Sequence, residues 1–131
     1  MENKLELSIK DYLIHNMFYI ASITIMKDAN LVSPLPKRLK AARKAAGYSQ
    51  SKLGILCGID ESSAAPRINQ YEKGTHSPTY LLVAAFAKAL DVPPYYFYIE
   101  DDKMAEIACR LNQLAIDEIQ SILDKTELVK K

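Results

Sequence analysis

A run of basic side chains is the first feature of this sequence that could do chemistry. Six of them occur between residues 37 and 59 with no acidic residue among them, so the stretch carries a charge of +6. They are Lys37, Arg38, Lys40, Arg43, Lys44 and Lys52. Acidic residues collect later, between residues 91 and 106, although the net charge of the whole chain is only +1. The pattern predicts one basic face suited to a polyanion; the competing interpretation is an ordinary solvated surface.

Residues that could support catalysis or bind a metal are few and lack partners in the sequence. Cys57 and Cys109 show neither CxxC nor Cys/His ligand spacing, which favours buried apolar side chains over a zinc site or a disulfide. His76 is expected to be exposed in a loop, with contact to a phosphate as the alternative, and His15 has no neighbouring partner. With no nucleophile and base pair, phosphate-cradling glycine loop or paired carboxylates, we expect no enzymatic activity, no cofactor and no metal.

Length and composition indicate one ordinary core with short appendages, because the chain has 131 residues and is 49% hydrophobic. The longest apolar stretch, residues 12–26, is interrupted by His15 and Asn16 and is shorter than a membrane span. We therefore expect neither a transmembrane helix nor a signal peptide, and a location in a reducing cytoplasm.

Prolines 34 and 36 predict a break in the chain, since each biases its predecessor away from helix. The extension before this break has apolar residues at helical spacing, but its β-branched residues over 20–25 also permit a strand. The helix-spaced residues are Ile9, Tyr12, Leu13, Met17, Ile20 and Ala21. A natural start at Met26 is a further hypothesis, because nothing before it is needed by the patterns that follow.

Helix signals follow one another after the prolines. Leu39, Ala42 and Ala46 share one face of a short helix that ends at Gly47. Ser49 then caps a second helix that ends at Gly58.

A third helix is expected from residue 64 or 65 to 73. Ser62 and Ser63 are its expected caps, Pro66 lies in its first turn, and Gly74 ends it. Ile68 and Tyr71 would face the core.

A fourth helix is expected to start near Pro78 and to stop before Pro93. Its expected inward residues are Leu81, Leu82, Ala85, Phe86, Ala89 and Leu90. The aromatic residues 95–98 begin a fifth turn or helix and are expected to pack on the core rather than to stack on bases. Beyond them, a stripe at helical spacing predicts a C-terminal helix. It consists of Met104, Ile107, Leu111, Leu114, Ile119, Ile122 and Leu123.

Several spaced motifs agree in order with one family. They are Gly47-Tyr48-Ser49-Gln50, Leu53-Gly54, Gly58-Ile59, Ile68-Asn69-Gln70-Tyr71-Glu72-Lys73-Gly74, Pro78 and Leu90-Asp91-Val92-Pro93. The chain thereby resembles the lambda-repressor-like (Cro-type, XRE) helix-turn-helix regulators over about half its length. The resemblance implies an all-α fold: a five-helix DNA-binding domain over residues 36–99, an N-terminal extension over 1–35, and a C-terminal helical segment over 100–131 that could dimerise.

The resemblance also implies which residues contact double-stranded DNA. Gln50, at the start of the second helix, would bind a phosphate, and Arg43 would pair with Glu72 while reaching the backbone. The alternative for this pair is a plain surface salt bridge. The implied base-facing positions are Ala65, Pro66, Arg67 and Gln70, whereas Asn69, Lys73 and Thr75 lie nearer the backbone. Arg67 and Gln70 are the specific candidates for base readout, because arginine pairs with guanine and glutamine with adenine. For each, the alternative is a plain exposed polar residue.

The sequence departs from the family pattern between Gly58 and Ile68, where residues 60–67 predict a longer turn than usual. In such a turn Ser62 or Ser63 could reach the DNA backbone, whereas Asp60 and Glu61 would be repelled by it. The leading hypothesis is a dimeric sequence-specific repressor. The alternative is a protein-interaction module, such as an antitoxin-like partner, that keeps the fold; the hydrophobic C-terminal stripe suits either.

Overall fold

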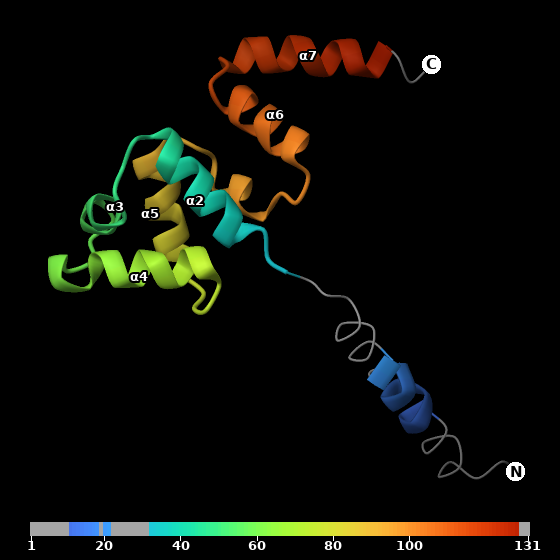
Figure 1. Ribbon diagram of the computed structural model, residues 1–131. Coiled ribbons are helices and arrows are strands. Elements are labelled where there is room, and N and C mark those ends of the chain that lie inside the picture. Colours follow the sequence, from blue (N-terminus) through green and yellow to red (C-terminus); the bar gives the residue numbers. More distant parts are fainter. Residues whose placement is uncertain (1–10, 19, 22–31, 129–131) are drawn as a thin grey trace, which may run out of the picture. The chain divides into compact units, whose positions relative to one another are not determined.

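The computed structural model describes residues 11–18, 20–21 and 32–128, and the described part is helical with no strand. The helices of the main unit are α2 Leu35–Ala45, α3 Gln50–Leu56, α4 Glu61–Lys73, α5 Tyr80–Leu90, the 3₁₀ helix η1 Pro94–Tyr98, α6 Asp102–Asn112 and α7 Ile116–Leu128 (Figure 1). This confirms the expected all-α class.

The chain divides into two units, residues 1–32 and 33–131. In the first unit, residues 11–18 and 20–21 are helical, and the described side chains are exposed. The strand alternative over residues 22–25 and the hypothetical start at Met26 lie outside the described residues.

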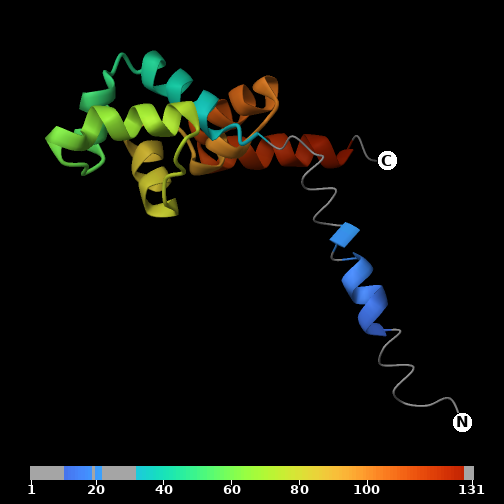
Figure 2. The same ribbon diagram turned by 60° about the horizontal axis from the view of Figure 1, so that its bottom comes forward.

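The core of the main unit forms where α2, α3, α4 and α5 meet. Its central ring is Phe86 on α5, which contacts the edges of Tyr71 on α4 and Phe97 on η1 at centroid distances of 6.1 and 6.5 Å. Leu39, Leu53, Ile68 and Val83 are fully enclosed around these rings. Helices α4 and α5 cross one another in both views (Figures 1 and 2). This core positions the exposed face of α4.

Side-chain caps fix where the helices begin. Ser49, Asp60, Thr79 and Asp101 each accept a hydrogen bond from a backbone N–H in the first turn of α3, α4, α5 and α6 respectively. The predicted stops at Gly47, Gly58 and Gly74 are present, with φ of 71°, 80° and 72°. Asp91 ends α5 in the same left-handed region, with φ of 53°.

The start of α4 corrects the sequence-based prediction. The helix begins at Glu61, three or four residues earlier than expected, because Asp60 rather than Ser62 or Ser63 caps it. Pro66 therefore lies inside the helix and not in its first turn. The residues expected to lengthen the turn are helical instead, and only residues 57–60 connect α3 to α4.

The buried face of α5 is also different from the predicted one. Leu81 is 81% exposed, whereas Val83 and Ala87 are buried beside the correctly predicted Phe86 and Leu90. Leu82, Ala85 and Ala89 are only partly buried. Nearly every residue of α5 is apolar, so the sequence offers little polar contrast to mark the inner face. Ala46, expected on the inner face of the first helix, lies just past the end of α2 and is exposed.

The aromatic cluster packs on the core only in part. Phe97 is fully buried and Tyr96 half-buried, while Tyr95 and Tyr98 are exposed. The C-terminal stripe forms two helices, α6 and α7, that are separated at residues 113–115. Only Ala105 and Ala108 of this segment are buried among the described side chains.

Candidate nucleic-acid interface

The two helices of the motif, α3 and α4, approach each other at Gly54 and Ala64, both of which are buried. A Cβ atom added to Gly54 would lie 2.6 Å from the Cβ of Ala64 and 2.9 Å from its Cα. Only glycine fits at this contact, so the backbones of α3 and α4 can pack closely behind the exposed surface of α4.

The exposed surface of α4 carries most of the predicted DNA-contacting residues. Helical spacing puts Pro66, Asn69, Gln70 and Lys73 opposite the buried Ile68 and Tyr71. Ser63 and Ala65 lie at the two margins of this face; they are half-buried, as are Asn69 and Gln70, whereas Pro66 and Lys73 are exposed. Thr75 lies beyond the helix end, where its hydroxyl donates to the carbonyl of Gln70 at 3.2 Å. Small and polar side chains thus cover the face that a groove of DNA would meet.

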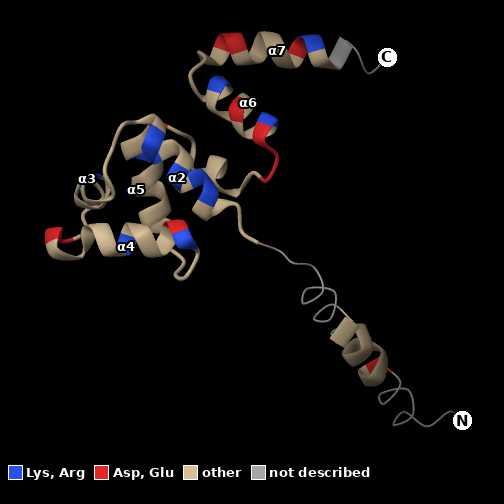
Figure 3. Cartoon of the chain, viewed as in Figure 1, with Lys and Arg blue, Asp and Glu red and all other residues tan. Residues whose placement is uncertain are grey.

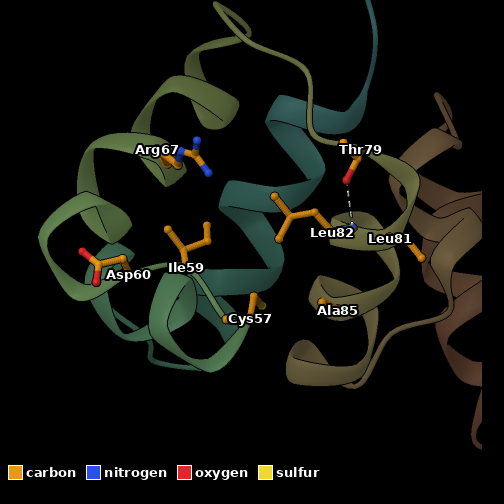
Figure 4. A pocket seen from close by; sticks show the side chains of 9 residues that line it. Cys57, Ile59, Asp60, Arg67, Thr79, Leu81, Leu82 and Ala85 are labelled. Carbon is orange, nitrogen blue, oxygen red and sulfur yellow. Dashed lines mark hydrogen bonds between the residues drawn. The ribbon is translucent and has the colours of Figure 1, made fainter.

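Arg67 occupies a different place from the other predicted contacts. Its side chain lies on the flank of α4, against a shallow groove of about 360 Å³ that Leu81, Leu82 and Ala85 of α5 line from the other side (Figure 4). Asp60, at the edge of this groove, points away from it and accepts from the backbone N–H of Ser62 at 3.1 Å. Base contact by Arg67 stays a prediction, and it requires the side chain to turn toward the outer face.

The pair between Arg43 and Glu72 that the resemblance implied is present. Two guanidinium nitrogens of Arg43 donate to the two carboxylate oxygens of Glu72, at 2.5 and 3.1 Å, and a third donates to the carbonyl of Tyr48 at 2.7 Å. The amide of Gln50 donates to the same carboxylate at 2.9 Å. Glu72 therefore joins α2, the start of α3 and the end of α4.

The environment keeps this pair ionised. Burial alone would raise the pKa of Glu72, but the hydrogen bonds from Arg43 and Gln50 and the charge of Arg43 outweigh it, so the pKa is lowered. The hydrogen bond to Glu72 raises the pKa of Arg43. One N–H of the Gln50 amide is still available for a phosphate, since a primary amide has two donors.

Internal pairing reduces the basic face that the sequence predicted. Lys37 and Arg38 both pair with Asp102, at 2.7 and 2.8 Å, and Arg43 is committed to Glu72. Lys40, Lys44 and Lys52 are exposed. Figure 3 shows the basic residues along α2 and the acidic segment that leads into α6. Two carboxylates, Asp102 and Glu72, therefore offset part of the +6 charge, and three of the six basic side chains are engaged in ion pairs.

The charge pattern of the sequence groups Arg38 with the exposed basic residues and does not predict its role. The side chain is only 6% exposed and donates to the carbonyls of Ile99 and Glu100, both at 2.9 Å. A signal was available: Arg38 follows Leu35 by three residues and precedes Ala42 by four, so it lies on the buried face of α2.

Among the described residues, no group of histidine, cysteine and acidic side chains could hold a metal ion. In the same part of the chain, no helix is long and apolar enough to cross a membrane.

Comparisons with known proteins agree with this geometry. A helix-turn-helix family model matches residues 39–97. The crystal structure of the transcriptional regulator BswR is 41% identical, covers 72% of this chain and 93% of its own, and superimposes with a TM-score of 0.67. The SinR protein/SinI protein complex has a chain with the same fold at 20% identity and a TM-score of 0.52, covering 73% of this chain and 97% of its own. No curated protein sequence matches the chain.

Proposed function

Because the chain belongs to the lambda-repressor-like (XRE-type) helix-turn-helix family of DNA-binding transcriptional regulators, we propose that it is a sequence-specific repressor that binds double-stranded DNA as a homodimer. The observation that carries the proposal is the polar outer face of α4, which a buried glycine contact and the Glu72 network hold beside the start of α3.

In this proposal, α4 enters the major groove and the start of α3 faces the sugar-phosphate backbone. Gln70 is the main candidate for base readout, because its amide can pair with adenine from the exposed face. Lys73 and Thr75 follow at the end of α4, where contact with phosphates would set the register without specifying sequence. The backbone N–H of Gln50, in the first turn of α3, favours an anion.

The dimer is proposed to form through α6 and α7. Large apolar side chains stay exposed along these two helices in the single chain. They include Met104, Ile107, Ile116, Ile122 and Leu123. Ile116 is 86% exposed, and apolar side chains gathered in this way favour burial against another surface. One domain reads only a half-site, so two copies would recognise an inverted repeat.

The test is selection of binding sites from a random duplex library, repeated at two salt concentrations, together with sedimentation of the free protein. Enrichment of a palindrome, affinity that falls steeply with salt, and a dimer at micromolar concentration would support the proposal. The double variant Arg67→Ala, Gln70→Ala should bind DNA with a weaker base preference than the unmodified protein. Absence of any enrichment, with no binding even at low salt, would contradict DNA recognition; a monomer would contradict the dimer alone. Repression itself is tested by a reporter under the selected site.

A second candidate function is binding of another protein through the same exposed residues of α6 and α7. The chain with this fold in the SinR/SinI structure is solved in complex with another protein. If this function holds, the double variant Arg67→Ala, Gln70→Ala loses its affinity for DNA but still co-purifies with the partner protein.

A further inference from the structure

Arg38 makes a set of contacts that the proposed DNA binding does not use. Its Nε donates to the carbonyl of Ile99 and one terminal nitrogen donates to the carbonyl of Glu100, both at 2.9 Å. The other terminal nitrogen pairs with Asp102 at 2.8 Å. The guanidinium also lies over the ring of Tyr96, 5.6 Å from its centroid. One buried side chain of α2 thus contacts η1, two residues of the connection and the first residue of α6.

The rest of α6 has little else to hold it against the helix-turn-helix domain. Its main packing partner is η1, and its buried side chains are the small residues Ala105 and Ala108. Two alanine side chains bury little apolar area, so they do little to fix the direction of α6 relative to the domain. A planar guanidinium that donates to three acceptors fixes both the distance and the angle at which α6 departs.

We propose that Arg38 is a positioning residue that sets the direction in which α6 and α7 leave the helix-turn-helix domain, and thereby the spacing of the DNA half-sites. The first part rests only on the contacts above. The second part rests on the proposed dimer, because the direction of α6 determines how far apart the two copies of α4 lie when the C-terminal segments join.

The chain supplies a matched control in Lys37, the neighbouring residue on α2. Lys37 carries the same charge and pairs with the same carboxylate at 2.7 Å, but its side chain is 65% exposed and forms none of the carbonyl contacts. Exposed lysine pairs contribute little. Arg38→Met and Lys37→Met therefore differ in the carbonyl contacts and not in net charge.

The direction of α6 can be measured without DNA by pulsed electron spin resonance. Spin labels are placed at the exposed positions Ala45→Cys on α2 and Asn112→Cys on α6, with both natural cysteines changed to alanine and labelled chains diluted in unlabelled protein. The distance distribution should widen by about twofold in Arg38→Met and stay unchanged in Lys37→Met. Arg38→Lys should give an intermediate width. An unchanged distribution in Arg38→Met overturns the proposal.

The DNA measurement uses the selected palindrome with one or two base pairs inserted between its half-sites. The parent should lose about tenfold or more in affinity on insertion, whereas Arg38→Met should lose less than about threefold. Both should bind an isolated half-site with equal affinity. Loss of half-site affinity, or an unchanged spacing preference, overturns the second part. If the parent enriches no palindrome, the proposed dimer fails, and the spin-label result still decides the first part.

Circular dichroism and thermal unfolding accompany each variant. If Arg38→Met does not fold, Arg38→Lys decides, because it keeps the charge and one contact. If both variants fail to fold, Arg38 is required for folding and the proposal is wrong.

Discussion

Arg43 on α2 and Glu72 at the end of α4 form a bidentate ion pair whose nitrogen–oxygen distances are 2.5 and 3.1 Å. The carboxylate side chain is only 3% exposed and the guanidinium side chain 11%. Removing one partner of such a pair leaves the other charge shielded from water and unpaired. We expect Glu72→Gln to lower the free energy of unfolding by about 3 kcal/mol, as measured by urea denaturation.

The control for this substitution is Arg110→Gln, which breaks the exposed pair between Arg110 and Glu106 on α6. That variant should change the free energy of unfolding by less than about 0.5 kcal/mol. Equal effects of the two substitutions would show that the pair with Arg43 is worth no more than a surface contact.

The lowered pKa of Glu72 predicts how the stability depends on pH. A carboxyl whose pKa is lower in the folded state stabilises the fold above its ordinary pKa of 4.5, and this contribution is lost as the pH falls through the folded value. The difference in stability between the natural chain and Glu72→Gln should be constant above about pH 5.5 and should shrink below the ordinary value. Urea titrations at several pH values test this. A difference that grows in acid would mean that the shift has the opposite sign.

Gly54 is expected to be intolerant of any side chain. Gly54→Ala places a Cβ atom 2.6 Å from that of Ala64, so α3 and α4 must separate, at a cost of about 1–3 kcal/mol. The double variant Gly54→Ala, Ala64→Gly should recover only part of the lost stability. The Cβ of residue 64 is gone, but its Cα still lies 2.9 Å from the added Cβ. Ser51→Ala on the same helix should have little effect. Thermal unfolding of the unmodified protein and these three variants tests the prediction. An unchanged melting temperature in Gly54→Ala would refute the close approach of α3 and α4.

Gln70 and Lys73 should fail in different ways when changed to alanine, if α4 enters the major groove. Gln70→Ala should relax the preference at one base pair, by about 1–3 kcal/mol. Lys73→Ala should weaken binding to all sequences and lower the salt slope by about 1. Competition binding with single-base variants of the selected site, at several salt concentrations, separates the two. The roles would be reversed if Lys73→Ala changed the base preference instead.

Ile122 tests the proposed dimer surface. The side chain is 40% exposed on α7, so Ile122→Glu should leave the chain folded but shift it to the monomer in sedimentation. Ser121→Glu adds the same charge to the adjacent exposed position and should leave the oligomeric state unchanged. A dimer in both variants would place the interface elsewhere, whereas a monomer in the unmodified protein would contradict the dimer itself.

The C-terminal ends of the helices were predicted well where a glycine or proline lies at the end itself. Gly47, Gly58 and Gly74 end helices as expected. The sequence predicted the start of α4 poorly, because serine and aspartate are all good caps and Pro66 is normally confined to the first turn. The cap at Asp60 and the packing of Ala64 against Gly54 outweigh that preference.

The part of the candidate site that depends only on residue spacing along one helix could be predicted from the sequence. Asn69, Gln70 and Lys73 lie on the accessible side of α4, as their spacing from Ile68 and Tyr71 required. The groove beside Arg67 and the contacts of Arg38 depend on segments many residues away, such as α5 and residues 99–102. No local pattern encodes such contacts, so the sequence predicted neither the burial of Arg38 nor the groove beside Arg67; base contact by Arg67 stays a prediction.

Pro66 lies in the middle of α4 and divides the hydrogen-bond ladder of that helix into two parts. The carbonyl of Ser62 would normally accept from the N–H of residue 66, one turn later. Proline has no N–H, so the backbone hydrogen-bond ladder of α4 is interrupted there. The turn before Pro66 can open without breaking the bonds that hold the later turns around Ile68 and Tyr71. Amides in that first turn should therefore exchange with deuterium well before those near Tyr71, and binding of DNA should slow them most.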